Sequence, residues 1–355
     1  MTPEYLVTLY DLNDQPVMEI SRFIRLNMEF VLNDVSTIEF DIDLDQFEAL
    51  CASVNATPRN LIYPQRTEIK IQRDGEYLFG GIVSNADSTL DEQDKTLHVT
   101  ADSYIHYFAS RYLSKTYTST DRSDIAWDAI DTVQSVTNGD LGVTEGTLAT
   151  TYDSDLTADY EDVKSIIQRY TYAQPTTYDF EITPLKVFNT YTRLGSDKPQ
   201  VVISYPEQIK SMEIPRGADS LANKIIGLGS GIGEERIQSI QTDSTSAITY
   251  RLKERKSLFN SVKEQSTLDD NTEGVLEQTK NVLVLPDVKI NGIFFDISEH
   301  KVGDAVTVLV SGSIYNDDVN GLFRIYKMSV SVDENMSEDI SLNFYKPGLG
   351  GEISE

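Results

Sequence analysis

The stretch Ile38-Glu-Phe-Asp-Ile-Asp-Leu44 alternates strictly between apolar and acidic residues. Its apolar members fall on every second position, which is the period of a β-strand with one buried face and one solvated face. The acidic members Glu39, Asp41 and Asp43 project together from the opposite side of the strand. The stretch therefore predicts a half-buried strand with three carboxylates on its solvent side.

A β-hairpin is predicted further along the chain. The segments Glu68-Ile-Lys-Ile-Gln72 and Glu76-Tyr-Leu-Phe79 flank Asp74-Gly75, a dipeptide that tolerates the positive φ values of a type I′ turn. In the simplest register Ile71 pairs with Leu78, and the apolar residues share one face. The first hundred residues thus read as antiparallel β-structure.

Helical spacing occurs only in the middle of the chain. Two stripes of apolar residues recur at intervals of three and four: Ala126, Ala129, Ile130 and Val133, and then Val163, Ile166, Ile167 and Tyr170. The run Thr-Asp-Arg-Ser at 120–123 supplies an N-cap for the first helix, and Asp159 is the expected N-cap of the second. Two short amphipathic helices between β-rich segments predict an inserted α/β domain.

Strand patterns return after residue 200, at 201–205, 306–310, 322–330 and 340–344. Residues 267–274 read as a polar break, followed by a short helix within 275–285. The fold class expected is mainly β with an α/β insert, that is, α+β. Its predicted divisions are a first β-barrel-like domain at 1–106, the insert at 107–200, a second β-barrel-like domain at 201–346 and a flexible tail at 347–355.

Composition points to a folded, acidic protein. The 355 residues are 39% hydrophobic and carry a net charge of −27, which repels nucleic acid because phosphate is bound by clustered Lys and Arg. The Met1-Thr-Pro-Glu start lacks the charged and apolar regions of a signal peptide, and no stretch approaches the 18 apolar residues of a membrane span. We therefore expect neither secretion by a signal peptide nor stable membrane insertion.

The sequence holds few residues suited to catalysis or metal binding. Cys51 is the one cysteine, so internal disulfides and multi-cysteine metal sites are excluded, and a small buried side chain is expected there. The histidines at 98, 106 and 300 have no His or Cys at ligand spacing, and we interpret them as structural. We predict no catalytic, cofactor-binding or metal-binding residue.

Two further patterns are weighed against ordinary structure. The glycine-rich segment Gly227-Leu-Gly-Ser-Gly-Ile-Gly233 is followed by Glu234 and Glu235, which would repel a pyrophosphate, so a glycine-rich turn is preferred to a cofactor loop. The acidic residues at 269–273 lack the alternate spacing of a calcium loop and are expected in a solvated loop. Three interpretations remain open for Glu39, Asp41 and Asp43: they line a negatively charged channel, they bind a cation, or they form an ordinary solvent-exposed strand face.

Three further stretches are informative: the hairpin at 73–82 leading into 101–113, the segment 124–134 followed by 138–143, and the segments 301–308 and 321–326. These stretches resemble parts of the hub proteins of long-tailed phages. Together they cover about residues 68 to 345, and their order is similar to that of tail hub or minor tail proteins, the baseplate hub family that also forms the N-terminal module of siphophage tail-associated lysins.

The resemblance implies a phage tail hub fold with two tube-like β-barrel domains flanking a small mixed domain. Three chains would form a pseudo-sixfold ring around a channel for DNA ejection. The implied partners are a distal tail protein or tail tube protein on one side, tail tip, spike or fibre proteins on the other, and DNA in transient passage. The implied location is the tail tip of the virion, after assembly in the host cytoplasm.

Glu39, Asp41 and Asp43 are the residues we expect to face that channel, because like charge lowers the adhesion of passing DNA. Two other functions remain as alternatives: a tail-associated cell-wall hydrolase, and a receptor-binding tail adhesin. A hydrolase requires a nucleophile or metal constellation that the sequence does not display, and a non-enzymatic structural subunit is the preferred interpretation.

Overall fold

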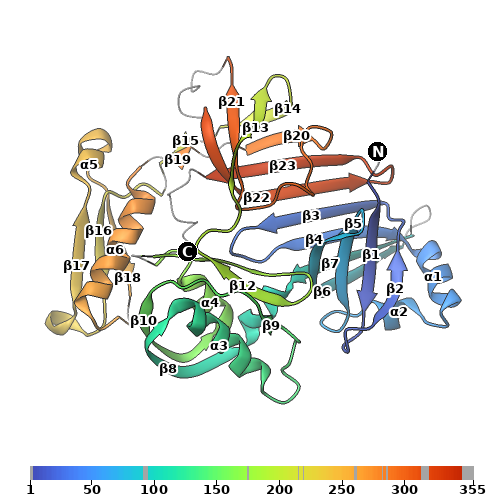
Figure 1. The fold of residues 1–355 in the computed structure, drawn as a ribbon, viewed down its shortest axis with the longest axis horizontal. Helices are drawn as coiled ribbons and strands as arrows, with labels where there is room; N and C mark the ends of the chain where they lie inside the picture. The colour runs from blue at the N-terminus through green and yellow to red at the C-terminus, as the bar shows by residue number, and fades with distance from the viewer. Residues whose placement is uncertain are drawn as a thin grey trace.

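The computed structural model describes residues 3–90, 95–173, 176–214, 216–218, 220–259, 262–281, 283–284, 287–312 and 320–345. Figure 1 shows a large sheet, an insert packed below it and a small unit at one end of the longest axis. Residues 347–355, where a flexible tail is predicted, lie outside the described residues.

The large sheet has 13 strands drawn from both ends of the chain. Its N-terminal strands are β1 (Tyr5–Tyr10), β2 (Pro16–Ile20), β3 (Arg25–Val31), β4 (Thr37–Asp43), β5 (Glu68–Arg73), β6 (Glu76–Leu90) and β7 (Lys95–Ser103). Its later strands are β13 (Asp197–Tyr205), β14 (Ile209–Glu213), β20 (Asp287–Asn291), β21 (Ala305–Val310), β22 (Gly321–Asp333) and β23 (Glu338–Tyr345). The strands expected near 201–205, 306–310, 322–330 and 340–344 are confirmed.

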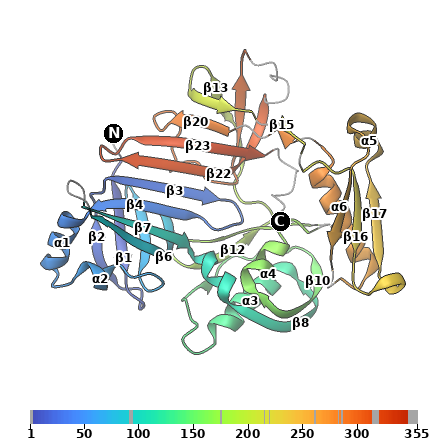
Figure 2. The same ribbon diagram turned by 180° about the vertical axis from the view of Figure 1, so that it is seen from behind.

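Strands β3 and β22 join the two β regions side by side. The order along the sheet is β14-β20-β23-β22-β3-β4-β7-β6-β5-β1-β2, with β21 also beside β22 and β13 beside β21. The β3–β22 pairing is antiparallel and runs from Val31 opposite Lys327 to Arg25 opposite Asp333. The two β regions therefore share one sheet (Figures 1 and 2).

One hydrophobic core lies beneath this sheet and includes residues from both β regions. From β4 it takes Ile38, Phe40 and Ile42, each at most 1% exposed, so the predicted period of two is confirmed. Leu44 does not continue the strand but begins helix α1 (Leu44–Ser53), which is followed by α2 (Pro58–Leu61). Cys51 is buried in the same core as a free thiol.

The β5–β6 hairpin forms as predicted, except for its register. Asp74 and Gly75 have φ values of 51° and 89°, the positive values that the turn requires. A β-bulge on β6 places Ile71 opposite Phe79, so the predicted pairing of Ile71 with Leu78 is wrong. The bulge turns Phe79 into the core, where it is 3% exposed.

The insert contains both predicted helices. Its elements are the 3₁₀ helix η1 (Tyr104–Ser110), β8 (Tyr112–Asp121), α3 (Arg122–Gln134), β9 (Thr144–Glu145), β10 (Asp153–Asp162), α4 (Val163–Arg169), β11 (Asp179–Ile182) and β12 (Val187–Tyr191). Asp121 caps α3 by accepting a hydrogen bond from Ser123 N, as predicted for the run at 120–123. The cap of α4 is Asp162, which accepts from Ser165 N at 2.8 Å, and Asp159 lies within β10, so that predicted cap is wrong.

Residues 216–284 form a small α/β unit inside the region where only a second β domain was predicted. Its elements are β15 (Arg216–Gly217), β16 (Lys224–Leu228), the 3₁₀ helix η2 (Gly233–Glu235), β17 (Gln238–Thr242), α5 (Ser244–Tyr250), β18 (Glu254–Leu258), α6 (Gln265–Thr279) and β19 (Leu283–Val284). The polar break predicted at 267–274 is wrong, because those residues form the middle of α6.

The chain is mainly β, which confirms the predicted class. The insert has its own hydrophobic core around α3 and α4, separate from that of the large sheet. Strand β13 crosses the boundary expected at residue 200 and pairs in parallel with β21. Among the described residues, no helix has both the length and the apolar character needed to cross a bilayer.

Candidate functional site: the polar face of the large sheet

The face of the large sheet opposite the core is lined by polar side chains. On β4, Glu39, Asp41 and Asp43 alternate with the buried apolar residues and lie on this face, as the sequence predicts. Glu39 is exposed, whereas Asp41 and Asp43 are partly buried. The three predicted site residues therefore lie along one row.

Asp41 and Asp43 each have a structural partner on this face. Asp41 Oδ2 pairs with Arg25 Nη2 at 3.0 Å, and Asp41 Oδ1 lies 2.5 Å from His98 Nδ1 on β7. Asp43 accepts a hydrogen bond from Gln46 N at 2.8 Å and so caps helix α1. The cap role was missed because Leu44 completes the alternating pattern in the sequence.

The polar face continues across the junction of the two β regions. The register places Asn27 between Glu39 on β4 and Ser331 on β22, and Ser331 is opposite Asp339 on β23. Lys289 on β20 is opposite Ser341 on β23. Since each of these strands is hydrogen bonded to the next, their polar side chains make one continuous surface. The separate segments of the sequence could not reveal it.

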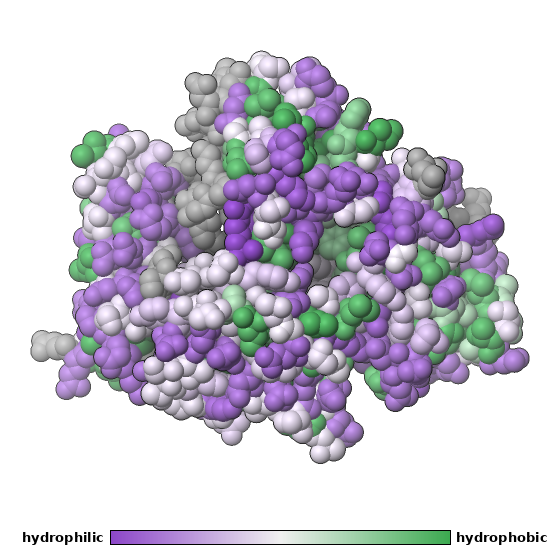
Figure 3. Space-filling view, in the orientation of Figure 1, coloured by the Kyte–Doolittle hydropathy of each residue, from purple (hydrophilic) through white to green (hydrophobic). Residues whose placement is uncertain are grey.

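A groove of about 370 Å³ lies on this face, lined by Asn27, Met28, Glu29, Thr37, Glu39, Lys289, Ser329, Val330, Ser331, Asp339 and Ser341. Figure 3 shows mostly hydrophilic side chains where β22 and β23 lie in this orientation. Glu29 forms an ion pair with Lys327 at 2.7 Å. Such exposed pairs contribute little to stability, so we interpret them as setting the charge pattern of the face.

A buried ion pair fixes the first β region against the second. Arg73 Nε donates to Glu338 Oε1 at 2.7 Å and Nη2 donates to Oε2 at 3.2 Å, so β5 and β23 are bridged by a bidentate contact. Tyr5 Oη donates to the same carboxylate at 2.5 Å. Burial and Glu338 together raise the pKa of Tyr5, so its hydroxyl stays protonated as a donor.

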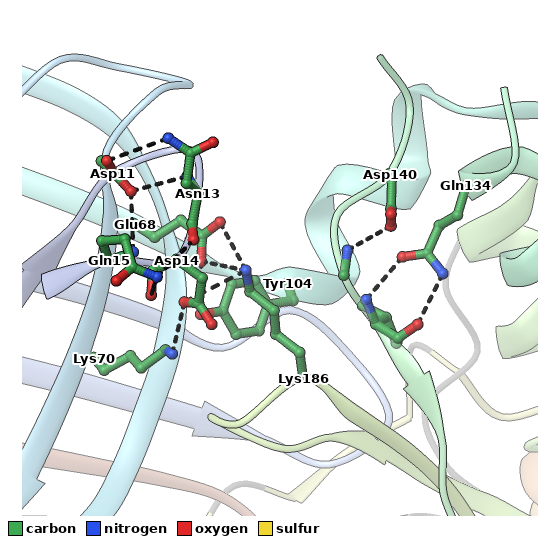
Figure 4. A network of polar contacts seen from close by, with 12 residues as sticks. Asp11, Asn13, Asp14, Gln15, Glu68, Lys70, Tyr104, Gln134, Asp140 and Lys186 are labelled. Carbon is green, nitrogen blue, oxygen red and sulfur yellow. Dashed lines mark hydrogen bonds and ion pairs between the residues drawn. The ribbon is translucent and has the colours of Figure 1, made fainter. Parts of the chain in front are cut away.

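A second buried cluster joins the first β region to the insert (Figure 4). Lys186 Nζ lies 2.8 Å from Glu68 Oε2, and both side chains are about 7% exposed. Tyr104 Oη donates to Glu68 at 3.1 Å, and Lys70 pairs with Asp14 at 2.8 Å beside them. Burial, then the charge of Glu68, raises the pKa of Tyr104.

A third cluster joins the insert to the second β region. Asp179 pairs with Arg324 on β22, accepts from Leu194 N at 2.7 Å, and accepts from Asn33 Nδ2 at 2.7 Å. Asn33 belongs to the β3–β4 connection, and its Oδ1 also accepts from Phe180 N at 2.9 Å. All three parts of the body therefore meet at Asp179, and their relative orientation is held by buried charged hydrogen bonds.

His300 belongs to a polar cluster beside β21. Lys198 Nζ lies 3.3 Å from its Nδ1 and 3.0 Å from Asp304 Oδ2. Burial and the neighbouring Lys198 lower the pKa of His300 below its ordinary value of 6.5. Burial opposes the ionisation of Asp304, but hydrogen bonds from Lys301 N and Ser196 N and the Lys198 ammonium lower the pKa of Asp304 below 3.8.

The described residues hold no group of three or more His, Cys, Asp or Glu side chains arranged to bind a metal ion. His106 lies 3.9 Å from Asp102 on the protein surface. At Gly227 an added Cβ would lie 1.9 Å from Thr272 Oγ1 of α6. This glycine therefore allows the helix to approach β16, which explains part of the glycine-rich segment without a bound ligand.

No family model matches the sequence, and no curated protein matches it. Solved structures do match across nearly the whole chain. The tail protein of prophage MuSo2 from Shewanella oneidensis superposes with a TM-score of 0.70 at 11% identity, covering 97% of this chain and 98% of that one. The tail protein from Neisseria meningitidis MC58 gives 0.67 at 11% identity, covering 98% of each chain.

A third match is the prophage tail protein gp18 from Listeria monocytogenes EGD-e, with a TM-score of 0.58 at 12% identity, covering 98% of this chain and 96% of that one. The chain thus has the fold of phage tail proteins, and the fold implied by the resemblance is confirmed.

Proposed function

We propose that this protein is a structural subunit of a phage tail tip or baseplate hub. Three chains form a pseudo-sixfold ring that links a tail tube or distal tail protein to tip, spike or fibre proteins, and the ring leaves a channel for DNA ejection. The observation that carries this proposal is the polar face that runs unbroken over strands of both β regions.

A sixfold-like ring built from three chains needs two wedges from each chain, set side by side about the axis. The regions expected at 1–106 and 201–346 supply the two wedges, and the β3–β22 pairing sets them side by side in one sheet. The buried pair of Arg73 and Glu338 resists rotation of one wedge against the other. The geometry therefore supports a rigid two-wedge protomer, with the insert at 107–200 outside the ring of strands.

In this ring the polar face lines the channel, with Glu39, Asp41 and Asp43 directed toward the axis. An acidic lining suits DNA passage because like charges weaken adhesion. The chain acts without catalysis in the virion tail after assembly in the host cytoplasm. The names of the similar proteins describe tail components, which favours a structural role over the alternatives of a cell-wall hydrolase or a receptor-binding adhesin.

The test is the mass and shape of the purified chain. Light scattering should give three times the chain mass of 39.8 kDa, and class averages from electron microscopy should show a ring with an axial hole. A reconstruction with Glu39 on the outer surface would contradict the channel assignment. Release of fragments from peptidoglycan would favour the hydrolase, and binding of the chain to host cells from the periphery of the tail would favour the adhesin.

A further inference from the structure

The small α/β unit has a sheet with one uncovered face. Strand β16 is central, paired with β17 on one side and with β18 on the other, and α6 packs against one face of β16 and β17. The register places Ile226 opposite Ile240, and Leu228 opposite Leu258, on the other face. Ile240 and Leu258 are 56% and 53% exposed, so four aliphatic side chains form an apolar patch open to solvent.

This open face is directed away from the rest of the protein. Figures 1 and 2 show α6 on the side of the strands nearer to the insert and the large sheet, with β17 at the outer margin. Figure 3 shows hydrophobic side chains at that margin. The patch therefore lies at the extremity of the longest axis, where another molecule can reach it.

The charge of the unit differs from that of the remaining chain. Residues 216–284 hold nine Lys and Arg residues and ten Asp and Glu residues, so nearly all of the net charge of −27 lies elsewhere. Four of the basic residues, Arg251, Lys253, Arg255 and Lys256, lie on or just before β18. Lys256 shares the open face with the patch, because it is opposite Ile226.

Basic residues along an edge strand oppose pairing of that edge with a strand of another chain. These residues therefore favour a contact through the open face over one through the edge of β18. A neutral to basic apolar patch on a strongly acidic protein is complementary to the acidic surface of a second copy of the same chain. A second copy of this chain therefore already carries the acidic surface that the patch requires in a partner.

We infer that the open face of β16, β17 and β18 docks against the acid-rich surface of the neighbouring copy and so joins the protomers of the ring. This inference rests on the trimer of the proposed function. The contact is head-to-tail, since the unit of one copy meets a different surface of the next, and three such contacts close a ring.

The experiment compares Ile240→Glu combined with Leu258→Glu against two control variants in the full chain. Each substitution places a charge at the centre of the contact, and loss of two anchors should weaken self-association by about 100-fold. The controls Leu12→Glu and Ile293→Glu alter residues of the large-sheet region that are 69% and 86% exposed, and they should leave association unchanged. Sedimentation velocity over a concentration series measures the effect, and circular dichroism verifies that each variant is folded.

A second measurement identifies the contact directly. A mixture of ¹⁵N-labelled and unlabelled chains is treated with a carbodiimide, which couples a lysine amine to a carboxylate in contact with it. Mixed-isotope links from Lys253 or Lys256 to acidic residues outside 216–284 are expected.

The outcomes separate the inference from the hub itself. A wild-type trimer that persists unchanged in the double variant overturns the inference and leaves the hub standing. A trimer without mixed-isotope links from β18 overturns it as well. A wild-type chain that remains monomeric overturns docking between copies, and the ring proposal then fails by its own electron-microscopy test.

Discussion

The large sheet and the small α/β unit differ in how many buried apolar side chains stabilise them. The large sheet covers one extensive core. Two buried charged clusters tie it to the insert, and a third joins its own two β regions. Among the described residues of the small unit, one apolar cluster consists of Ala222, Ile225 and Leu276, with Val275 packed against it, and Leu268 is also buried. Because stability is distributed unevenly within proteins, we expect the small unit to open more readily than the large sheet.

Glu338→Ala should produce the largest loss of stability, because it leaves the Arg73 guanidinium and the Tyr5 hydroxyl buried without the carboxylate that accepts their hydrogen bonds. Removing one member of a buried pair costs about 3–5 kcal/mol of the free energy of unfolding. Urea denaturation monitored by fluorescence measures it. The adjacent Asp339→Ala is the control, since Asp339 is exposed and pairs with exposed Lys210; equal losses in both variants would refute the structural role of the buried pair.

Ile225→Ala should open the small unit alone. Truncating this fully buried side chain costs about 2–4 kcal/mol, and the described residues of the unit offer few other buried apolar side chains to compensate. Hydrogen exchange should accelerate in β16, β17 and β18 while β3 and β22 stay protected. Ile38→Ala, which truncates an equally buried isoleucine of the large sheet, should instead lower the stability of the whole sheet. Uniform acceleration in the first variant would show that the two parts unfold together.

Gly227→Ala should separate α6 from β16, because the new methyl group would lie 1.9 Å from Thr272 Oγ1. Overpacking of this kind costs about 1–3 kcal/mol. Adding Thr272→Ala removes the obstructing atoms and should restore part of the loss, which a double-mutant cycle of thermal unfolding measures. Gly217→Ala, where the added Cβ has no atom within 4 Å, should change little. Equal losses with and without the rescue would place the strain elsewhere.

The smallest effect concerns pH. The pKa of His300 is lowered below 6.5 in the folded protein, so the unfolded chain binds the proton more readily. The contribution of His300 to stability is therefore fully present above pH 6.5. It decreases as the pH falls toward the lower pKa that His300 has in the folded protein. His300→Gln should remove this part of the pH dependence, a change below about 1 kcal/mol. Denaturation midpoints at pH 7.5, 6.5 and 5.5 test it; parallel curves for the two proteins would exclude His300 as the source.

Asp304, in the same cluster, should affect the stability of the fold at lower pH. Its lowered pKa stabilises the fold above pH 3.8, and that contribution is lost as the pH falls further.

Local patterns predicted the elements, and long-range pairing decided the architecture. The alternation around Phe40 and the stripe around Ile130 predicted a strand and a helix correctly, because each periodicity is complete within a dozen residues. The β-bulge opposite Ile71 was missed because a bulge leaves no mark on composition. Helix α6 was missed because Asp269, Asp270 and Asn271 are consecutive polar residues in its middle, and polar runs resemble loops.

The candidate site was predicted only in part. The row of Glu39, Asp41 and Asp43 follows from one strand, but its continuation through Ser331 and Asp339 depends on pairing across some 300 residues. The residues that orient the parts, Glu68, Asp179 and Glu338, carry no local signal, since a buried carboxylate and an exposed one look alike in a sequence.

The antiparallel pairing of β3 with β22 also determines when the large sheet can fold during synthesis. When the ribosome has released residues 1–105, strand β3 has its β4 neighbour but lacks the one supplied by residues 321–333. The nascent chain must carry that unpaired edge until β22 has emerged, and pairing at such sequence separation is slow. A complete large sheet therefore forms only after residue 333 has been synthesised, and chains that terminate before β22 cannot complete it.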